Sequence, residues 1–393
     1  MTKEKQQILS TLSTKLFSNT NITTSDFFEQ KNLMLEAIHQ TVFPLVFSAL
    51  QSETDVSAYL PQYYAVVANN IKVSEEHKAL HKLLTANDIT YVFIKGCASA
   101  YYYPDPLLRT MGDVDLLVQE RDIEKTVELL LKNGYSQDDE DDGKGHISFH
   151  NQKTGVHIEL HRQIIGIPEN SAGAKLKEYF ADIFKKAVLE NGEYYRPCDF
   201  HHGLILLLHT AQHLTREGVG LRHICDWVVF ANSFSDSDFV TKFKEKLKSV
   251  GLWQFAKILT QFGIEYLGCP PKTWCTEPDM AVLEGLLYDV FSGGNFGKKD
   301  FSRYQHIKYI TNRTEADTKK STLKQLFSNI VAKTRLEVKF VKKTPWLLPI
   351  GVLCVSLKYF WLIISGKRKM DNSTLIHKAL DRKELYKSFK LFK

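Results

Sequence analysis

The chain has 393 residues, which is more than one small core needs and enough for two or three packed units. Its hydrophobic content of 44% and aromatic content of 12% exclude an intrinsically disordered chain. The formal net charge of +6 suits a polyanionic small molecule but is too small for a dedicated nucleic-acid binder.

The cysteines and the N-terminus bear on the cellular compartment. Six cysteines are scattered without any CxxC pair, and the charged start MTKEKQQILSTLSTKLF contains no long apolar stretch. A secretory signal needs such a stretch, and scattered cysteines are typical of free thiols in a reducing compartment. We therefore expect a cytoplasmic protein.

The first two segments differ in hydrophobic periodicity. Residues 1–85 have apolar residues at spacings of three and four, which predicts helices. Within residues 86–170 the pattern alternates between strands and helices. Short β-rich runs predict strands at 91–94 and 113–118. The helices expected there are 97–103, which ends before Pro104 and Pro106, and 120–133.

The second segment ends with a predicted hairpin, in which residues 146–150 and 156–161 pair across the turn between them. Everything after about residue 175 is predicted to be helical. We expect a helical domain over residues 171–310 and a basic C-terminal segment over 311–393 that contains an apolar helix. The predicted fold class is α+β, a small mixed-sheet core set between helical segments, with a mostly helical C-terminal half.

Three acidic residues form the candidate catalytic site. Asp113 and Asp115 are two residues apart on a strand, so both carboxylates point to one face about 7 Å apart. Carboxylate oxygens are hard ligands suited to Mg²⁺. Glu159 shares the polar face of the hairpin and joins the pair if the two strands are neighbours. A DxD pair is more often a solvated edge feature, but apolar residues 116–118 indicate a buried strand, where unpaired carboxylates are costly.

Several short motifs are similar to one known family, the uncharacterised bacterial nucleotidyltransferases called the type 5 group, within the DNA-polymerase-beta-like superfamily. The matching residues are Ile94-Lys95-Gly96, Tyr103-Pro104-Asp105-Pro106, Arg109, Gly112 to Val118 and Val156 to His161.

The resemblance implies a nucleotidyltransferase core at residues 86–170, in which Asp113, Asp115 and Glu159 are the catalytic residues and bind Mg²⁺ or Mn²⁺. The residues expected near the NTP are Lys95, Gly96, Arg109 and Gly112. Gly96 would form a tight turn for the phosphates.

Two of these expectations carry a qualification from the sequence itself. The superfamily usually has Gly-Ser or Gly-Gly at the turn, whereas this chain has Gly96-Cys97, so backbone amides or Lys95 would replace a hydroxyl contact. Arg109 is a natural phosphate ligand. It could equally pair with Asp105 or Asp113 in a structural role.

The histidines of the helical half admit two interpretations. His202, His209 and His213 lie at spacings of seven and four, near one helical face. An HxxxH pair can bind zinc, but no third ligand is evident, so a packed or substrate-facing polar seam is favoured. For Arg222 and Asp226 on the next helix, an intramolecular hydrogen-bond network is at least as good an explanation as a binding role.

The apolar stretch 346–365 is nearly as long as a membrane span and has lysines on both sides. Pro349 and Lys358 count against a span, so we favour a helix docked on the protein, with an interfacial helix and a span as alternatives. Peripheral contact with the inner face of the membrane therefore stays open.

The expected function is metal-dependent transfer of a nucleoside monophosphate from an NTP to a hydroxyl acceptor. An antibiotic, a sugar, a protein side chain or a tRNA would each serve, with nucleic acid disfavoured by the modest charge. The alternatives are an inactive scaffold that kept the fold and the toxin of a toxin–antitoxin pair. Because closely spaced carboxylates repel without a cation, we expect Asp115→Asn to stabilise the metal-free protein or leave it unchanged.

Overall fold

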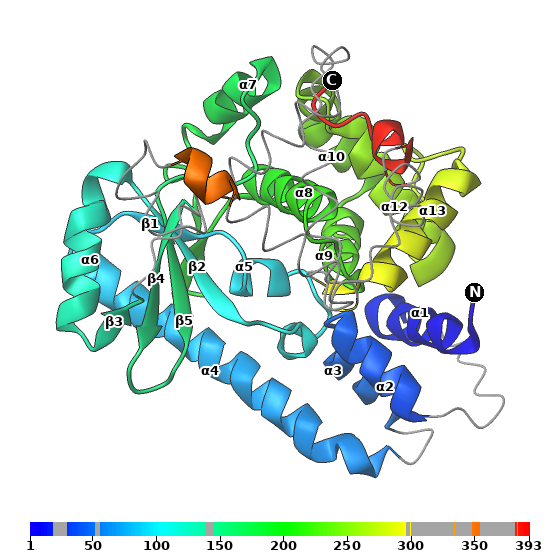
Figure 1. Ribbon diagram of the computed structural model, residues 1–393, viewed down its shortest axis with the longest axis horizontal. Coiled ribbons are helices and arrows are strands. Elements are labelled where there is room, and N and C mark those ends of the chain that lie inside the picture. Colours follow the sequence, from blue (N-terminus) through cyan, green and yellow to red (C-terminus); the bar gives the residue numbers. More distant parts are fainter. Residues whose placement is uncertain are drawn as a thin grey trace. The chain divides into compact units, whose positions relative to one another are not determined.

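The computed structural model (Figure 1) describes residues 1–18, 30–51, 56–138, 145–295, 299, 334, 348–353, 382 and 384–393. Backbone contacts divide the chain into two units, one of residues 1–300 with 385–393 and one of residues 301–384. In the second unit, residues 348–353 are helical. The rest of the predicted apolar helix at 346–365 lies outside the described residues. No helix in the described ranges is long and apolar enough to cross a membrane.

The first unit contains a five-stranded mixed sheet, which confirms the predicted α+β class. The strand order is β1-β2-β5-β4-β3; β2 and β5 are parallel and the other neighbours are antiparallel. The bounds are β1 Tyr91–Phe93, β2 Asp113–Val118, β3 Tyr135–Gln137, β4 His146–Asn151 and β5 His157–His161.

One face of the sheet is apolar and covered by two helices. Side chains alternate between the faces of a strand, so Leu116 and Val118 of β2 share this face with Ile158 and Leu160 of β5. They form one buried cluster with residues of α4 (Leu60–Thr85) and α6 (Ile123–Lys132). Figure 1 shows these two helices against the sheet. Burial of this face fixes the register of both strands.

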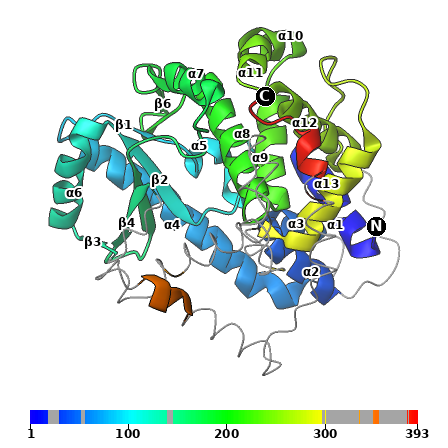
Figure 2. The same cartoon turned by 45° about the horizontal axis from the view of Figure 1, so that its top comes forward.

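The opposite face of the sheet carries the polar residues and is near a helical pair, α8 (Asp199–Thr215) and α9 (Leu221–Asn232). Val92 and Leu117 on this face belong to the same buried cluster as the apolar residues of both helices. Figure 2 shows α8 and α9 side by side next to the sheet. The polar residues of the sheet therefore lie between strands and helices.

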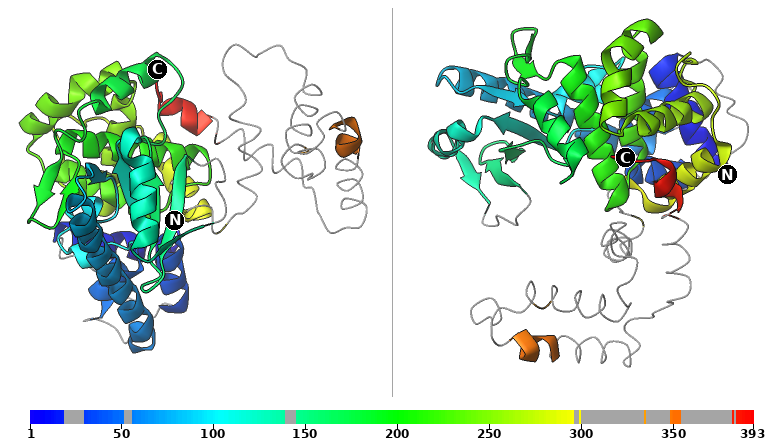
Figure 3. Two further views of the ribbon diagram at one scale, coloured as in Figure 1. Left: turned by 90° about the vertical axis from the view of Figure 1, so that its left-hand side faces the viewer. Right: turned by 90° about the horizontal axis from the view of Figure 1, so that it is seen from above.

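The remaining helices build the larger core around α8 and α9. The C-terminal residues 385–393, drawn in red in Figure 3, pack on this core. Phe389 is fully buried there, and the Tyr386 hydroxyl donates to the Leu214 carbonyl at 2.6 Å. The other α-helices are α1 Lys3–Phe17, α2 Gln30–His39, α3 Phe43–Leu50, α5 Cys97–Ala100, α7 Ser171–Phe180, α10 Asp236–Phe239, α11 Glu245–Ser249, α12 Trp253–Leu267 and α13 Met280–Gly293.

The chain after residue 175 is not wholly helical, which corrects the prediction. A two-stranded sheet, β6 (Val188–Glu190) and β7 (Tyr194–Arg196), interrupts it. The turn contains Asn191 and Gly192, both with positive φ, and Asn-Gly is a strong sequence signal for a tight hairpin. That signal was present in the sequence, but strands of three residues are too short for their alternation to stand out.

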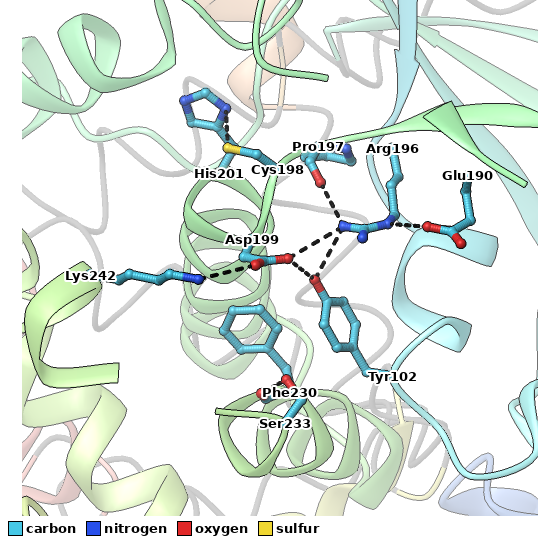
Figure 4. A network of polar contacts seen from close by, with 10 residues as sticks. All are labelled: Tyr102, Glu190, Arg196, Pro197, Cys198, Asp199, His201, Phe230, Ser233 and Lys242. Atoms are coloured by element: carbon cyan, nitrogen blue, oxygen red, sulfur yellow. Dashed lines mark hydrogen bonds and ion pairs between the residues drawn. The ribbon is translucent and has the colours of Figure 1, made fainter. Parts of the chain in front are cut away.

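A polar network fixes the start of α8 (Figure 4). Arg196 donates from Nε to Glu190 at 3.0 Å, and its Nη1 lies 3.5 Å from Asp199. The Tyr102 hydroxyl donates to the same Asp199 oxygen at 2.9 Å, and Lys242 lies 3.5 Å from the other oxygen. The β6–β7 hairpin, the segment after α5 and the first turn of α8 are therefore tied together, which sets where the histidines of α8 stand.

Candidate active site

The three predicted acidic residues lie on neighbouring strands. Strands β2 and β5 are parallel, with Asp113 opposite His157 and Asp115 opposite Glu159. Because alternate residues share a face, the two aspartates and Glu159 are on the same side of the sheet. The condition that the sequence left open, that these strands are neighbours, is confirmed.

Asp115 is buried between two basic groups. Its Oδ1 lies 2.5 Å from Lys95 Nζ and 3.0 Å from His161 Nε2. Burial alone would raise the pKa of Asp115, but Lys95 and the hydrogen bond from His161 outweigh it and lower that pKa. The same contacts outweigh burial for the partners and raise the pKa of both Lys95 and His161. Asp115 is therefore a firmly ionised carboxylate.

Asp113 has different surroundings although it shares the strand face. Its carboxylate has no hydrogen-bond partner within the described part of the chain. Burial and then the charge of Asp115 raise its pKa from 3.8 to about 6, against a smaller opposing effect of Lys95. Of the three acidic residues, Asp113 is therefore the one whose negative charge is least balanced by nearby positive groups.

Glu159 is held by two histidines. Its Oε1 lies 3.5 Å from His146 Nε2, and its Oε2 lies 3.4 Å from His161 Nε2. Burial raises the pKa of Glu159, but the hydrogen bond with His161 and the nearby cations produce a net lowering. The ligand atoms of these three residues lie within 4.8 Å of one another. The sequence had suggested no role in this site for either His161 or His146.

The acidic residues fit a hard divalent cation. Asp113 offers both oxygens, and Asp115 has Oδ2 outside the contacts with Lys95 and His161. Burial first and the charge of Asp115 second raise the pKa of Asp113, and a nearby cation would offset both effects. Oxygen donors of this kind are the ligands that Mg²⁺ and Mn²⁺ take in proteins.

The turn before α5 requires glycine. Gly96 has φ +55°, and a Cβ there would come within 3.0 Å of His77 Nε2. The predicted tight turn is therefore confirmed, while its contact with phosphates stays a prediction. Cys97 begins α5 and is buried, its thiol 3.9 Å from the Met111 sulfur. At Gly112 an added Cβ would meet nothing within 4 Å, so space does not demand glycine there.

Arg109 is buried and bound to α9. It donates from Nε and Nη2 to the two oxygens of Asp226 at 2.7 and 2.8 Å, and from Nη1 to the Gly96 carbonyl at 3.3 Å. Tyr103 also donates to Asp226, at 2.7 Å. The alternative pairing of Arg109 with Asp105 or Asp113 is therefore wrong, and the network interpretation of Asp226 is confirmed. The predicted contact between Arg109 and phosphates stays a prediction.

The predicted histidine seam divides into two groups. His202 stacks on Tyr102 with ring centroids 5.1 Å apart. His209 and His213 come together with His223 of α9 instead. Burial, followed by the charge of Lys95, lowers the pKa of His209. Sequence reasoning could not find His223 as a third member, because only tertiary packing brings the two helices together.

Residues 28–267, well over half of the chain, match a family described as uncharacterised nucleotidyltransferases. The chain belongs to this family. A comparison with curated proteins finds no match.

Proposed function

We propose that the protein is a metal-dependent nucleotidyltransferase that moves a nucleoside monophosphate from an NTP to a hydroxyl acceptor. The observation that carries the proposal is the placement of Asp113, Asp115 and Glu159 on one face of two paired strands. Family membership supports the reaction class, and the carboxylate set supports the metal dependence.

In the proposed reaction, the acceptor oxygen attacks the α-phosphorus and forms a new P–O bond. The bond from the α-phosphorus to the bridging oxygen breaks, and pyrophosphate leaves with that oxygen. A bound Mg²⁺ or Mn²⁺ supplies charge neutralisation at the phosphates. Asp113 and Asp115 would hold the ion, and Glu159 would either complete its ligands or accept the proton of the acceptor hydroxyl.

The cationic residues have proposed roles on the NTP side. Lys95 is placed between the carboxylates and the turn, so it can contact phosphates when the ion takes over its charge interaction with Asp115. Gly96 and Gly112 would allow the close approach of the NTP to the backbone. Arg109 would contribute through the Gly96 carbonyl to which it donates, by holding that turn in place.

The experiment for binding is thermal unfolding of the full chain with each of the four NTPs, with and without Mg²⁺. We expect at least one NTP to raise the melting temperature only when Mg²⁺ is present. Asp115→Asn should abolish that shift, because the amide keeps the shape but loses the charge. Glu159→Gln should keep most of the shift. If no NTP gives a Mg²⁺-dependent shift in the wild type, the inactive-scaffold alternative replaces the enzyme.

A further inference from the structure

Three histidines meet between helices α8 and α9, apart from the acidic residues of the proposed nucleotide site. His209 and His213 lie one turn apart on α8, and His223 lies on α9. The ligand atoms of all three lie within 4.8 Å of one another. The rings of His209 and His213 have centroids 4.4 Å apart. Imidazole nitrogens converging from two helices are a donor set for a transition metal.

A carboxylate orients one of these histidines. Glu217 Oε2 lies 2.9 Å from Nδ1 of His213. With Nδ1 bonded to Glu217, a metal ion would require Nε2 of His213 as its ligand. Metal-binding histidines usually donate their second ring nitrogen to a carboxylate or a carbonyl in this way, which fixes the ring and raises its basicity. Glu217 lies just after the last turn of α8, so packing within the helix does not impose its contact with His213.

We propose that His209, His213 and His223 bind a divalent transition-metal ion of the Zn²⁺ type, with the fourth position open to water or another ligand. Zn–N bonds of about 2.0–2.1 Å require the three nitrogens to approach further, which small rotations of the imidazoles provide. His223 is buried, whereas His209 and His213 are partly exposed. Mg²⁺ prefers oxygen ligands, so the two sites take different ions. This proposal does not depend on nucleotidyl transfer.

The experiment measures Zn²⁺ binding to the metal-free full-length protein, by competition with a chromogenic chelator and by metal content after gel filtration. A Co²⁺-loaded sample adds a direct probe, because its visible spectrum reports nitrogen ligation and coordination number. We expect one tightly bound Zn²⁺ per wild-type chain. Glu217→Gln should weaken Zn²⁺ binding by about 10- to 100-fold, and His209→Gln or His223→Gln should weaken it further.

Two control variants separate this site from other histidines. His157→Gln removes a histidine whose side chain is 65% exposed, and His146→Gln removes one from the group around Glu159. Both should keep full Zn²⁺ binding. The proposal is overturned if the wild type binds no Zn²⁺. It is also overturned if binding survives in folded His209→Gln and His223→Gln or is lost in His146→Gln. Circular dichroism of each variant shows that it is folded.

Discussion

Asp113 and Asp115 share a strand face but have opposite electrostatic surroundings. Their common face follows from the two-residue period of a strand and was predictable from the sequence. The partners of Asp115 were not predictable, because Lys95 comes from the segment after β1 and His161 from β5. The expectation that Asp115→Asn spares the metal-free protein rested on repulsion between the carboxylates. In the structure, the charge of Asp115 raises the pKa of Asp113, whereas Asp115 itself lies in a buried ion pair with Lys95.

The structure therefore predicts that Asp115→Asn destabilises the metal-free protein. The substitution leaves Lys95 partly buried beside a neutral amide, and breaking a buried pair from one side costs about 3 kcal/mol. Urea unfolding of the metal-free variant at pH 7 measures the change in the free energy of unfolding. Asp113→Asn is the matched control, because Asp113 makes no side-chain hydrogen bond or ion pair with the other residues that the structure describes. Equal stability of Asp115→Asn and wild type would show that the contact between Asp115 and Lys95 does not stabilise the metal-free protein.

Asp113→Asn should stabilise the metal-free protein, and the effect should depend on pH. The carboxyl group has an ordinary pKa of 3.8 and a pKa of about 6 in the folded protein. Between these values the folded state holds more protons than the unfolded state, so stability falls as pH rises from 4 to 6.

Asp113→Asn has no carboxyl group there and so does not lose stability in this way. Its free energy of unfolding should exceed that of the wild type by about 1–3 kcal/mol at pH 7 and by almost nothing at pH 4. Unfolding curves of both proteins across this range measure the difference, and Mg²⁺ should shrink it at pH 7. A difference that does not vary with pH would show that the pKa of Asp113 is not raised.

Among the elements, β1, β2 and the β4–β5 hairpin were predictable from local patterns, whereas the short strands β3, β6 and β7 and the contacts between elements were not. The run from Asp113 to Val118 forms β2 as predicted, because its alternation is set within six residues. The Arg109–Asp226 pair joins residues 117 positions apart, and the sequence holds no local signal for it. Arg222 and Asp226 lie on the next helix as predicted, since α8 and α9 are separated by a segment with two glycines, Gly218 and Gly220.

The ion pair between Arg109, which precedes β2, and Asp226 of α9 gives a prediction for Arg109. Arg109→Ala leaves Asp226 buried without its cation, which should lower the free energy of unfolding by about 3–5 kcal/mol. It should also weaken Mg²⁺-dependent NTP binding by about 1–3 kcal/mol, because the Gly96 turn loses a charged donor. Urea unfolding and NTP titration of the same sample measure both effects. Lower stability with unchanged NTP affinity would show that Arg109 has only a structural role, through its ion pair with Asp226 of α9.

At the scale of the whole molecule, the C-terminus is part of the first unit although a segment of the second unit precedes it. Phe389 is fully buried beside Phe255 of α12, with ring centroids 5.5 Å apart. Phe389→Ala should therefore lower the free energy of unfolding by about 3–5 kcal/mol through lost burial and the cavity left behind. Truncation after residue 384 should have a larger effect. Wild-type stability of either variant in urea would show that this segment does not belong to the core.

The central claim concerns the whole molecule, since it states that the chain transfers a nucleoside monophosphate. The most direct measurement incubates the purified protein with cell lysate, Mg²⁺ and each NTP in turn. The NTP is labelled either at the α-phosphate or at the γ-phosphate. We predict that the α-label enters one acceptor, that the γ-label appears in pyrophosphate, and that Asp113→Asn and Asp115→Asn abolish both. Transfer of the γ-label to the acceptor, or the same α-labelling by the folded Asp variants as by wild type, would contradict the account.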